Sequence, residues 1–128
     1  IAADVHRWLE SIDEAGYLCE TPDGRGRSRA ESGARVARMI CADLEMLGAR
    51  DITAIAEHVA RAQVKQIKSG MRQVMRRLGP ASPRVAVVAG QGAFLARAAA
   101  EELGLTPRDL AARIGSAAAR AAPAVAVA

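Results

Sequence analysis

The chain has 128 residues, about enough for one domain, and a net charge of +4. Its residues are 51% hydrophobic, but thirty of them are alanine and only Trp8, Tyr17 and Phe94 are aromatic, so burial removes little apolar area per residue. There is no apolar run of about eighteen residues and no leader with a charged and then an apolar part, which disfavours membrane spanning and secretion and predicts a cytoplasmic protein.

Both ends of the sequence predict a piece of a longer protein. It begins at Ile1, inside an apparent helix and without an initiator methionine, and it ends in the apolar run 121–128, typical of a buried helix just starting. We therefore expect residues 1–128 to form a single partial domain whose alanine-rich core relies on a partner surface or on a second copy. Cys19 and Cys41 lack metal-type spacing and are expected to be buried, reduced thiols.

The first part of the chain is predicted to be helical. Apolar residues recur at helical spacing from Ala3 to Ala15, and Gly16 suits the left-handed position that ends a helix. After a short extended stretch, Thr21-Pro-Asp-Gly24 predicts a turn. Ser28-Arg-Ala-Glu31 then matches a capping box, which predicts a second helix running to Gly48.

The longest predicted element is a helix that begins at Asp51 or Thr53 and ends at Gly79-Pro80. Its apolar residues recur at near-helical spacing, and its length would be about 40 Å at 1.5 Å per residue. After Pro83 the pattern becomes that of a strand. The apolar run 84–89, bounded by proline and glycine, is typical of a fully buried parallel strand.

A further helix is predicted from Ala93 to Leu103 and ends at Gly104; its expected inward-facing residues are Phe94, Leu95, Ala98 and Leu103. The segment 107–114 remains ambiguous. Thr106-Pro107 favours the start of a helix, whereas Leu110–Ile114 fits a second strand.

The sharpest local motif is Gly90-Gln-Gly92, between the predicted strand and helix. Glycines at such a junction let a ligand approach the backbone, and the free amides of the helix favour an anion. Gly90 and Gly92 are therefore candidate nucleotide- or ligand-binding residues. Leu95 stands where the dinucleotide fingerprint needs a third glycine, and no Walker lysine follows, so a bare tight turn remains an equal alternative.

A second motif is the glycine- and arginine-rich loop before the second helix. Two guanidiniums, flexible glycines and free helix amides together favour an oxyanion or diphosphate site. The candidate residues are Asp23, Gly24, Arg25 and Arg27. The alternative is a solvated polar turn.

A basic stripe on the long helix comprises Arg61, Lys65, Lys68, Arg72 and Arg76. It would suit a phosphate backbone, but no aromatic stacking residues accompany it, so a solvated helix face is favoured and nucleic acid is not an expected partner. His6 and His58 have no metal-binding spacing, and no nucleophile–histidine arrangement can be argued. No metal ligand is predicted, and the catalytic residues stay unassigned.

Several segments of the chain resemble the carboxy-terminal part of the hydantoinase/oxoprolinase-like family. They are the runs 4–9, 21–28, 37–43, 88–96 and 121–128. The resemblance covers nearly the whole chain, and it is closer to the branch linked to tetrahydromethanopterin-dependent C1 transfer, which includes a methanofuran-type synthase.

The resemblance implies an α/β fold, namely part of one lobe of the actin-like ATPase fold shared by sugar kinases and Hsp70, helix-rich with a short parallel strand pair. It implies a larger two-lobed protein whose amino-terminal lobe, with its phosphate motif, is the missing partner, so the chain alone is expected to be inactive. Gly90 and Gly92 would occupy the position that meets adenosine in ATP-using relatives. The sequence specifies no cofactor, and the use of Mg²⁺ or ATP by the full-length protein stays open.

The implied function is that of a transferase in the biosynthesis of a methanofuran-type C1 carrier. Such an enzyme condenses an aminomethyl-furan diphosphate with the phenol of a (glutamyl)tyramine and releases pyrophosphate. Its partner would be a small phosphorylated substrate, with Arg25 and Arg27 holding the leaving diphosphate. The alternatives are an ATP-dependent hydrolase of the hydantoinase/oxoprolinase type and, less favoured, a basic helical nucleic-acid-binding module.

Overall fold

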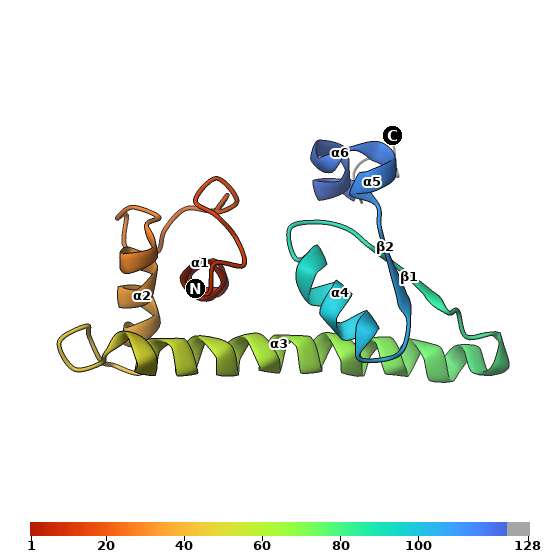
Figure 1. The fold of residues 1–128 in the computed structure, drawn as a ribbon, viewed down its shortest axis with the longest axis horizontal. Coiled ribbons are helices and arrows are strands. Elements are labelled where there is room, and N and C mark those ends of the chain that lie inside the picture. Colours follow the sequence, from red (N-terminus) through yellow and green to blue (C-terminus); the bar gives the residue numbers. More distant parts are fainter. Residues whose placement is uncertain (123–128) are drawn as a thin grey trace. The chain divides into compact units, whose positions relative to one another are not determined.

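The computed structural model describes residues 1–122 (Figure 1). Contacts between residues divide the chain into two compact units, with unit 1 comprising Ile1–Ala62 and unit 2 beginning at Gln63. Helix α3 (Ala49–Leu78) contributes residues to both units. The predicted long helix is confirmed, and its 30 residues correspond to about 45 Å at the usual rise per residue.

The core of unit 1 lies where α1 (Ala2–Trp8) and α2 (Arg29–Arg38) meet the first turns of α3. Its buried residues are Val5, Trp8, Val36, Ile52 and Ala56. The indole of Trp8 donates a hydrogen bond to Thr53 Oγ1 at 3.0 Å. Gly33 of α2 faces the same ring so closely that a Cβ there would lie 2.5 Å from Trp8 Cζ3. Glycine is therefore what lets α1 and α2 approach.

The start of α2 follows the predicted capping box. Ser28 Oγ accepts a hydrogen bond from the Glu31 amide at 3.2 Å, and the Glu31 carboxylate accepts one from the Ser28 amide at 3.1 Å. The hydrogen bonds with Ser28 lower the pKa of Glu31 below its ordinary value. The carboxylate is thus held ionised at the positive end of the helix dipole.

Three predictions for unit 1 are wrong. Helix α1 ends at Trp8 rather than Ala15, since the chain reverses through Glu10, whose φ is 57°. The reversal brings Tyr17 back against α1, where it is fully buried, so a tertiary contact outweighs helical periodicity. Helix α2 likewise ends at Arg38 instead of Gly48, and the apolar Met39 and Ile40 that follow it are exposed. Both cysteines are exposed rather than buried.

Unit 2 contains a parallel strand pair joined by a helix (Figure 1). After the short 3-10 helix Gly79–Ala81, strand β1 (Val85–Val88) leads into α4 (Ala93–Glu101) and then β2 (Thr106–Asp109). The register pairs Val85 with Thr106 and Val88 with Asp109. Two short helices follow, α5 (Ala111–Ile114) and α6 (Ser116–Arg120). This confirms a helix-rich α/β chain with a short parallel strand pair.

The ambiguous segment 107–114 differs from both local expectations. Thr106-Pro107 lies in β2 instead of starting a helix, and 111–114 is helical instead of forming a strand. The Thr106 amide donates to Arg84 O at 2.8 Å and the Leu110 amide to Val88 O at 2.9 Å. Because backbone amides alternate in direction along a strand, the Pro107 nitrogen faces the free edge, where proline is tolerated.

Strand β1 is parallel as predicted, but it is not fully buried. Val88 is 2% exposed, whereas Val85 and Val87 are 47% and 67% exposed. Side chains alternate along a strand, so one face of β1 is covered and the other stays open within residues 1–122. On α4 the buried residues are Ala99 and Ala100, and the four residues expected to face inward are only partly buried. No helix within residues 1–122 is long and apolar enough to cross a membrane.

Candidate functional site

The predicted diphosphate loop of unit 1 is a tightly hydrogen-bonded turn. The Gly24 amide donates to Thr21 O at 3.2 Å, and Gly24 takes the left-handed conformation, with φ of 66°. Thr21 Oγ1 donates to Arg25 O at 2.6 Å. The Glu31 carboxylate accepts from the Gly26 amide at 3.0 Å, which ties the turn to the start of α2.

Asp23 is engaged by several donors within this turn. Its carboxylate accepts hydrogen bonds from Arg38 Nη1 at 2.8 Å and from Arg35 Nη1 at 3.0 Å. The Arg25 amide donates to the same carboxylate at 3.2 Å. The hydrogen bond from Arg38, followed by those from Arg25 and Arg35, lowers the pKa of Asp23 to about 2. Asp23 is therefore an anion at neutral pH, and its contacts fix the turn.

Arg35, which sequence reasoning did not single out, organises this part of the molecule. It is 3% exposed, and its Nε donates to the fully buried Asp4 at 2.6 Å. Its Nη2 donates to Gly26 O at 3.0 Å, so one guanidinium joins α1, α2 and the loop. Burial alone would lower the pKa of Arg35, but the hydrogen bonds and charges of Asp4 and Asp23 raise it above its ordinary value. In the sequence, the only indication of this role is the position of Arg35 between Ser32 and Val36, on the side of α2 that faces inward.

Tyr17 completes the buried network. Its hydroxyl donates to Asp4 Oδ1 at 3.0 Å, the oxygen that also accepts from Arg35. Burial, with the hydrogen bond to Asp4, raises the pKa of Tyr17 to about 12. The phenol is thus a neutral donor at physiological pH. The guanidinium of Arg27 lies over the Tyr17 ring, 5.7 Å from its centroid.

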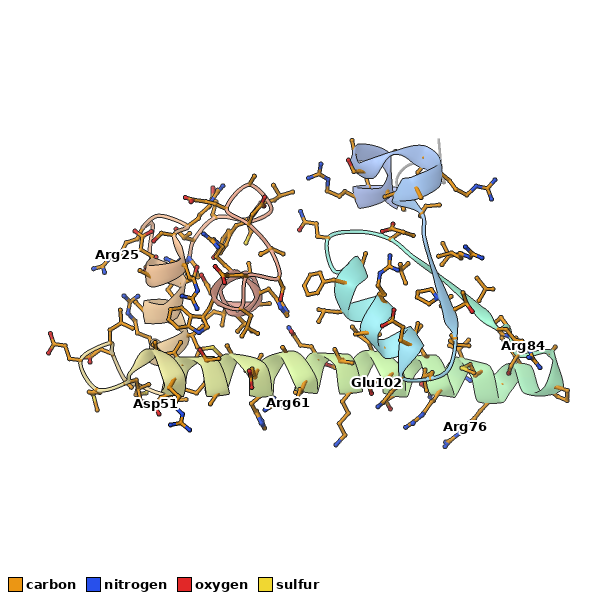
Figure 2. The ribbon with its side chains drawn as sticks, viewed as in Figure 1. Arg25, Asp51, Arg61, Arg76, Arg84 and Glu102 are labelled. Carbon is orange, nitrogen blue, oxygen red and sulfur yellow. The ribbon has the colours of Figure 1, made fainter. Side chains whose placement is uncertain are left out.

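The outer side of the loop borders a hollow of about 470 Å³. Arg25 and Arg27 line it together with Glu14 and Glu20, so two cations and two anions face the same space. Figure 2 shows the Arg25 side chain pointing away from the ribbon of α2. Within residues 1–122 the Arg25 guanidinium has no ion pair or hydrogen bond, so this cation is free to meet an anion.

Gly90 and Gly92 lie at the junction of β1 and α4, as predicted. Gly90 has a φ of 86°, and its amide donates to Ala119 O of α6 at 3.1 Å. Gly92 is the N-cap of α4, with φ of −89°. A Cβ at either position would meet no atom of the described chain within 4 Å. The structure thus places both glycines beside open space. They belong to unit 2, and the loop residues belong to unit 1.

The basic residues of α3 are only partly free. Lys68 pairs with Glu102 in unit 2, and Arg61 pairs with Glu57 in unit 1 at 3.2 Å. Figure 2 shows Arg76 projecting from α3. Within residues 1–122, no three His, Cys, Asp or Glu side chains gather as a metal site. The family-like run 121–128 lies almost wholly outside the described residues.

Comparison with known proteins agrees with the motifs. The model of the hydantoinase/oxoprolinase family matches residues 1–128. A "(4-{4-[2-(gamma-L-glutamylamino)ethyl]phenoxymethyl}furan-2-yl)methanamine synthase" from Methanococcus vannielii is 27% identical over 103 residues, which is 80% of this chain and 45% of that protein. The synthase of the same name from Methanocaldococcus jannaschii is 30% identical over 77 residues, which is 60% of this chain and 23% of that protein. The matched segments thus cover less than half of the length of each relative.

Proposed function

Because the chain belongs to the hydantoinase/oxoprolinase family, we propose that it is part of a transferase that builds a furan-containing C1 carrier of the methanofuran type. The observation that carries this proposal is the similarity to two synthases of one named product, over 80% and 60% of this chain. The chain would form part of a lobe of the actin-like ATPase fold, and the rest of the enzyme would supply the other lobe.

The proposed reaction joins a phenol to a furan-bearing methylene carbon. The bond between that carbon and a diphosphate oxygen breaks, the phenol oxygen forms the new C–O bond and loses its proton, and pyrophosphate leaves. Charge develops on the departing diphosphate, so fixed cations near it lower the barrier. We assign this role to Arg25 and Arg27, while Asp23 and Gly24 hold the turn that presents them. Glu14 and Glu20 balance the charges of the two arginines, so the net charge of the hollow does not by itself favour an anion. The assignment is supported instead by the Arg25 guanidinium, which has no partner within residues 1–122.

The test is steady-state kinetics on the full-length protein, with pyrophosphate release as the readout. Arg25→Ala should lower kcat by about tenfold or more and change KM less, since the cation acts mainly on charge that develops in the transition state. The matched control is Arg50→Ala, an exposed arginine on α3 outside the loop. Full turnover in Arg25→Ala would contradict the diphosphate site and would mean that the loop is a solvated turn.

A second candidate is an ATP-dependent hydrolase, which the family's description favours. The same preparation distinguishes the two. ATP hydrolysis dependent on a hydantoin or on 5-oxoproline, without pyrophosphate release from a furan diphosphate, would replace the transferase with the hydrolase.

A further inference from the structure

Unit 2 contains a hollow that none of the predicted site residues line. Its volume is about 630 Å³, within the range of about 300–1,000 Å³ that is usual for small-molecule pockets. Its apolar wall includes the exposed Val85 and Val87 of β1 together with Pro107 and Leu110. Such a wall suits a flat apolar group, because each contact removes apolar area from water.

The hollow borders an edge of the sheet that does not favour a further strand. Residues from both faces of β2 line it, so it wraps around the free side of that strand. The Pro107 nitrogen faces this side and has no hydrogen to donate, so a strand added there would lose a ladder hydrogen bond. The space is therefore better suited to a ligand than to continuation of the sheet.

The charges around the hollow favour an anion. Its one carboxylate among the described residues, Asp109, is already engaged: one oxygen accepts from the Ala111 amide at 2.9 Å and the other from Arg97 Nη2 at 3.3 Å. Arg108 and Arg113 also line the hollow, and within residues 1–122 neither guanidinium has a hydrogen bond or ion pair. Two uncompensated cations thus stand beside an apolar wall.

We propose that this hollow binds an arylalkyl carboxylate, with its carboxylate at Arg108 and Arg113 and its ring against Val85 and Val87. A guanidinium pairs with a carboxylate through two parallel hydrogen bonds, which orients the ligand as well as holding it. The inference rests on the proposed function, because a glutamylated tyramine joins a carboxylate to a phenol ring. It assigns that acceptor substrate to the hollow of unit 2.

The test is calorimetric titration of the full chain with 3-(4-hydroxyphenyl)propanoate, alongside tyramine and acetate. Tyramine has a similar ring but carries an ammonium, and acetate has the carboxylate without the ring. The arylalkyl carboxylate should bind at least about tenfold more tightly than either. Arg108→Gln and Arg113→Gln should each raise its Kd by about tenfold. Arg120→Gln, an exposed arginine on α6 outside the hollow, should leave the Kd unchanged.

Tyramine or acetate binding as tightly as 3-(4-hydroxyphenyl)propanoate would overturn the proposal, and so would an unchanged Kd for that ligand in both glutamine variants. If those variants lose their helical circular dichroism, Val87→Gln takes their place, since Val87 is already 67% exposed. If the Kd of the carboxylate is unchanged in Val87→Gln, the ring of the ligand does not lie against the valines of β1. Calorimetry measures binding without turnover, so the two proposals can fail separately. If the carboxylate binds through both arginines but the full-length protein lacks transferase activity, only the proposed function is refuted. Turnover with unchanged acceptor KM in Arg108→Gln and Arg113→Gln would refute only this inference.

Discussion

At the scale of single residues, the most consequential side chain is Arg35, because one buried guanidinium meets Asp4, Asp23 and the carbonyl of Gly26. Hydrogen bonds to a buried charge offset the cost of removing it from water, and Arg35 donates such bonds through Nε, Nη1 and Nη2. Loss of Arg35 would leave the buried carboxylate of Asp4 without its guanidinium partner. The loop that carries Arg25 therefore depends on residues that lie outside it.

The buried phenol of Tyr17 predicts a loss of stability in alkali. Its pKa is about 12 in the folded chain against 10.0 ordinarily, so the neutral phenol is favoured by folding. This contribution is complete below pH 10.0 and is lost as the pH rises through about 12. Near pH 8, Tyr17→Phe should cost about 1–3 kcal/mol through loss of a hydrogen bond to a buried carboxylate, and the gap from the unmodified chain should close between about pH 10 and 12.

Tyr17 is the chain's one tyrosine, so the ultraviolet absorbance of tyrosinate follows this group alone. Urea denaturation of both proteins across the pH range supplies the stability difference. A tyrosinate transition near its ordinary pKa, or a stability gap that stays constant up to pH 12, would contradict the network.

At the scale of elements, the contact between α1 and α2 predicts that two glycine-to-alanine changes have opposite effects on the stability of the chain. In Gly33→Ala the new Cβ would lie 2.5 Å from a Trp8 ring that is held by a hydrogen bond to Thr53 and by the guanidinium of Arg29, 4.3 Å from its centroid. Overpacking of this kind should destabilise the chain by about 1–3 kcal/mol. Gly70→Ala on α3 meets nothing within 4 Å and should stabilise it by up to about 1 kcal/mol.

Thermal or urea denaturation of the two variants compares these signs directly. Equal, small effects of Gly33→Ala and Gly70→Ala would mean that the helices separate without cost and that Gly33 does not set their spacing.

The junction between β1 and α4 predicts a change in binding that is separate from stability. Gly92 has a negative φ and open space where a Cβ would stand, so Gly92→Val should alter the free energy of unfolding by less than about 1 kcal/mol. If a ligand approaches this backbone, the branched side chain should raise the KM of the full-length protein. Steady-state kinetics together with urea denaturation give both quantities, and an unchanged KM would favour a bare tight turn.

At the scale of the whole molecule, the chain should be marginally stable or self-associating. Its two units have small cores, and the buried apolar residues of α4 are alanines. Large apolar side chains are exposed within residues 1–122, including Met46 at 71%, Val87 at 67% and Val74 at 56%. Exposed apolar area on this scale favours association. Urea denaturation over about a tenfold range of protein concentration should show a midpoint that is low or rises with concentration. A steep, high midpoint at every concentration would contradict this.

Local signals in the sequence determined much of this protein. The capping box at Ser28, the turn closed by Gly24, the long helix and the strand–glycine–helix order around Gly90 all follow from interactions between residues near one another in the chain. The family resemblance rests on the same motifs, and the comparisons confirm it. Short-range hydrogen bonding and backbone conformation are encoded where they act, so the sequence alone suffices for them.

Only the tertiary structure decided where α1 stops, that Thr106–Asp109 is a strand, and that Asp23 is held by Arg35 and Arg38. Each depends on partners distant in sequence: Tyr17 returning to Asp4, β2 pairing with β1 despite its proline, and α2 reaching the loop. The free energy of such contacts exceeds the small preferences of single residues for helix or strand. For the same reason the sequence alone did not indicate Arg108 and Arg113 as binding residues, since only the fold brings them beside the exposed valines of β1.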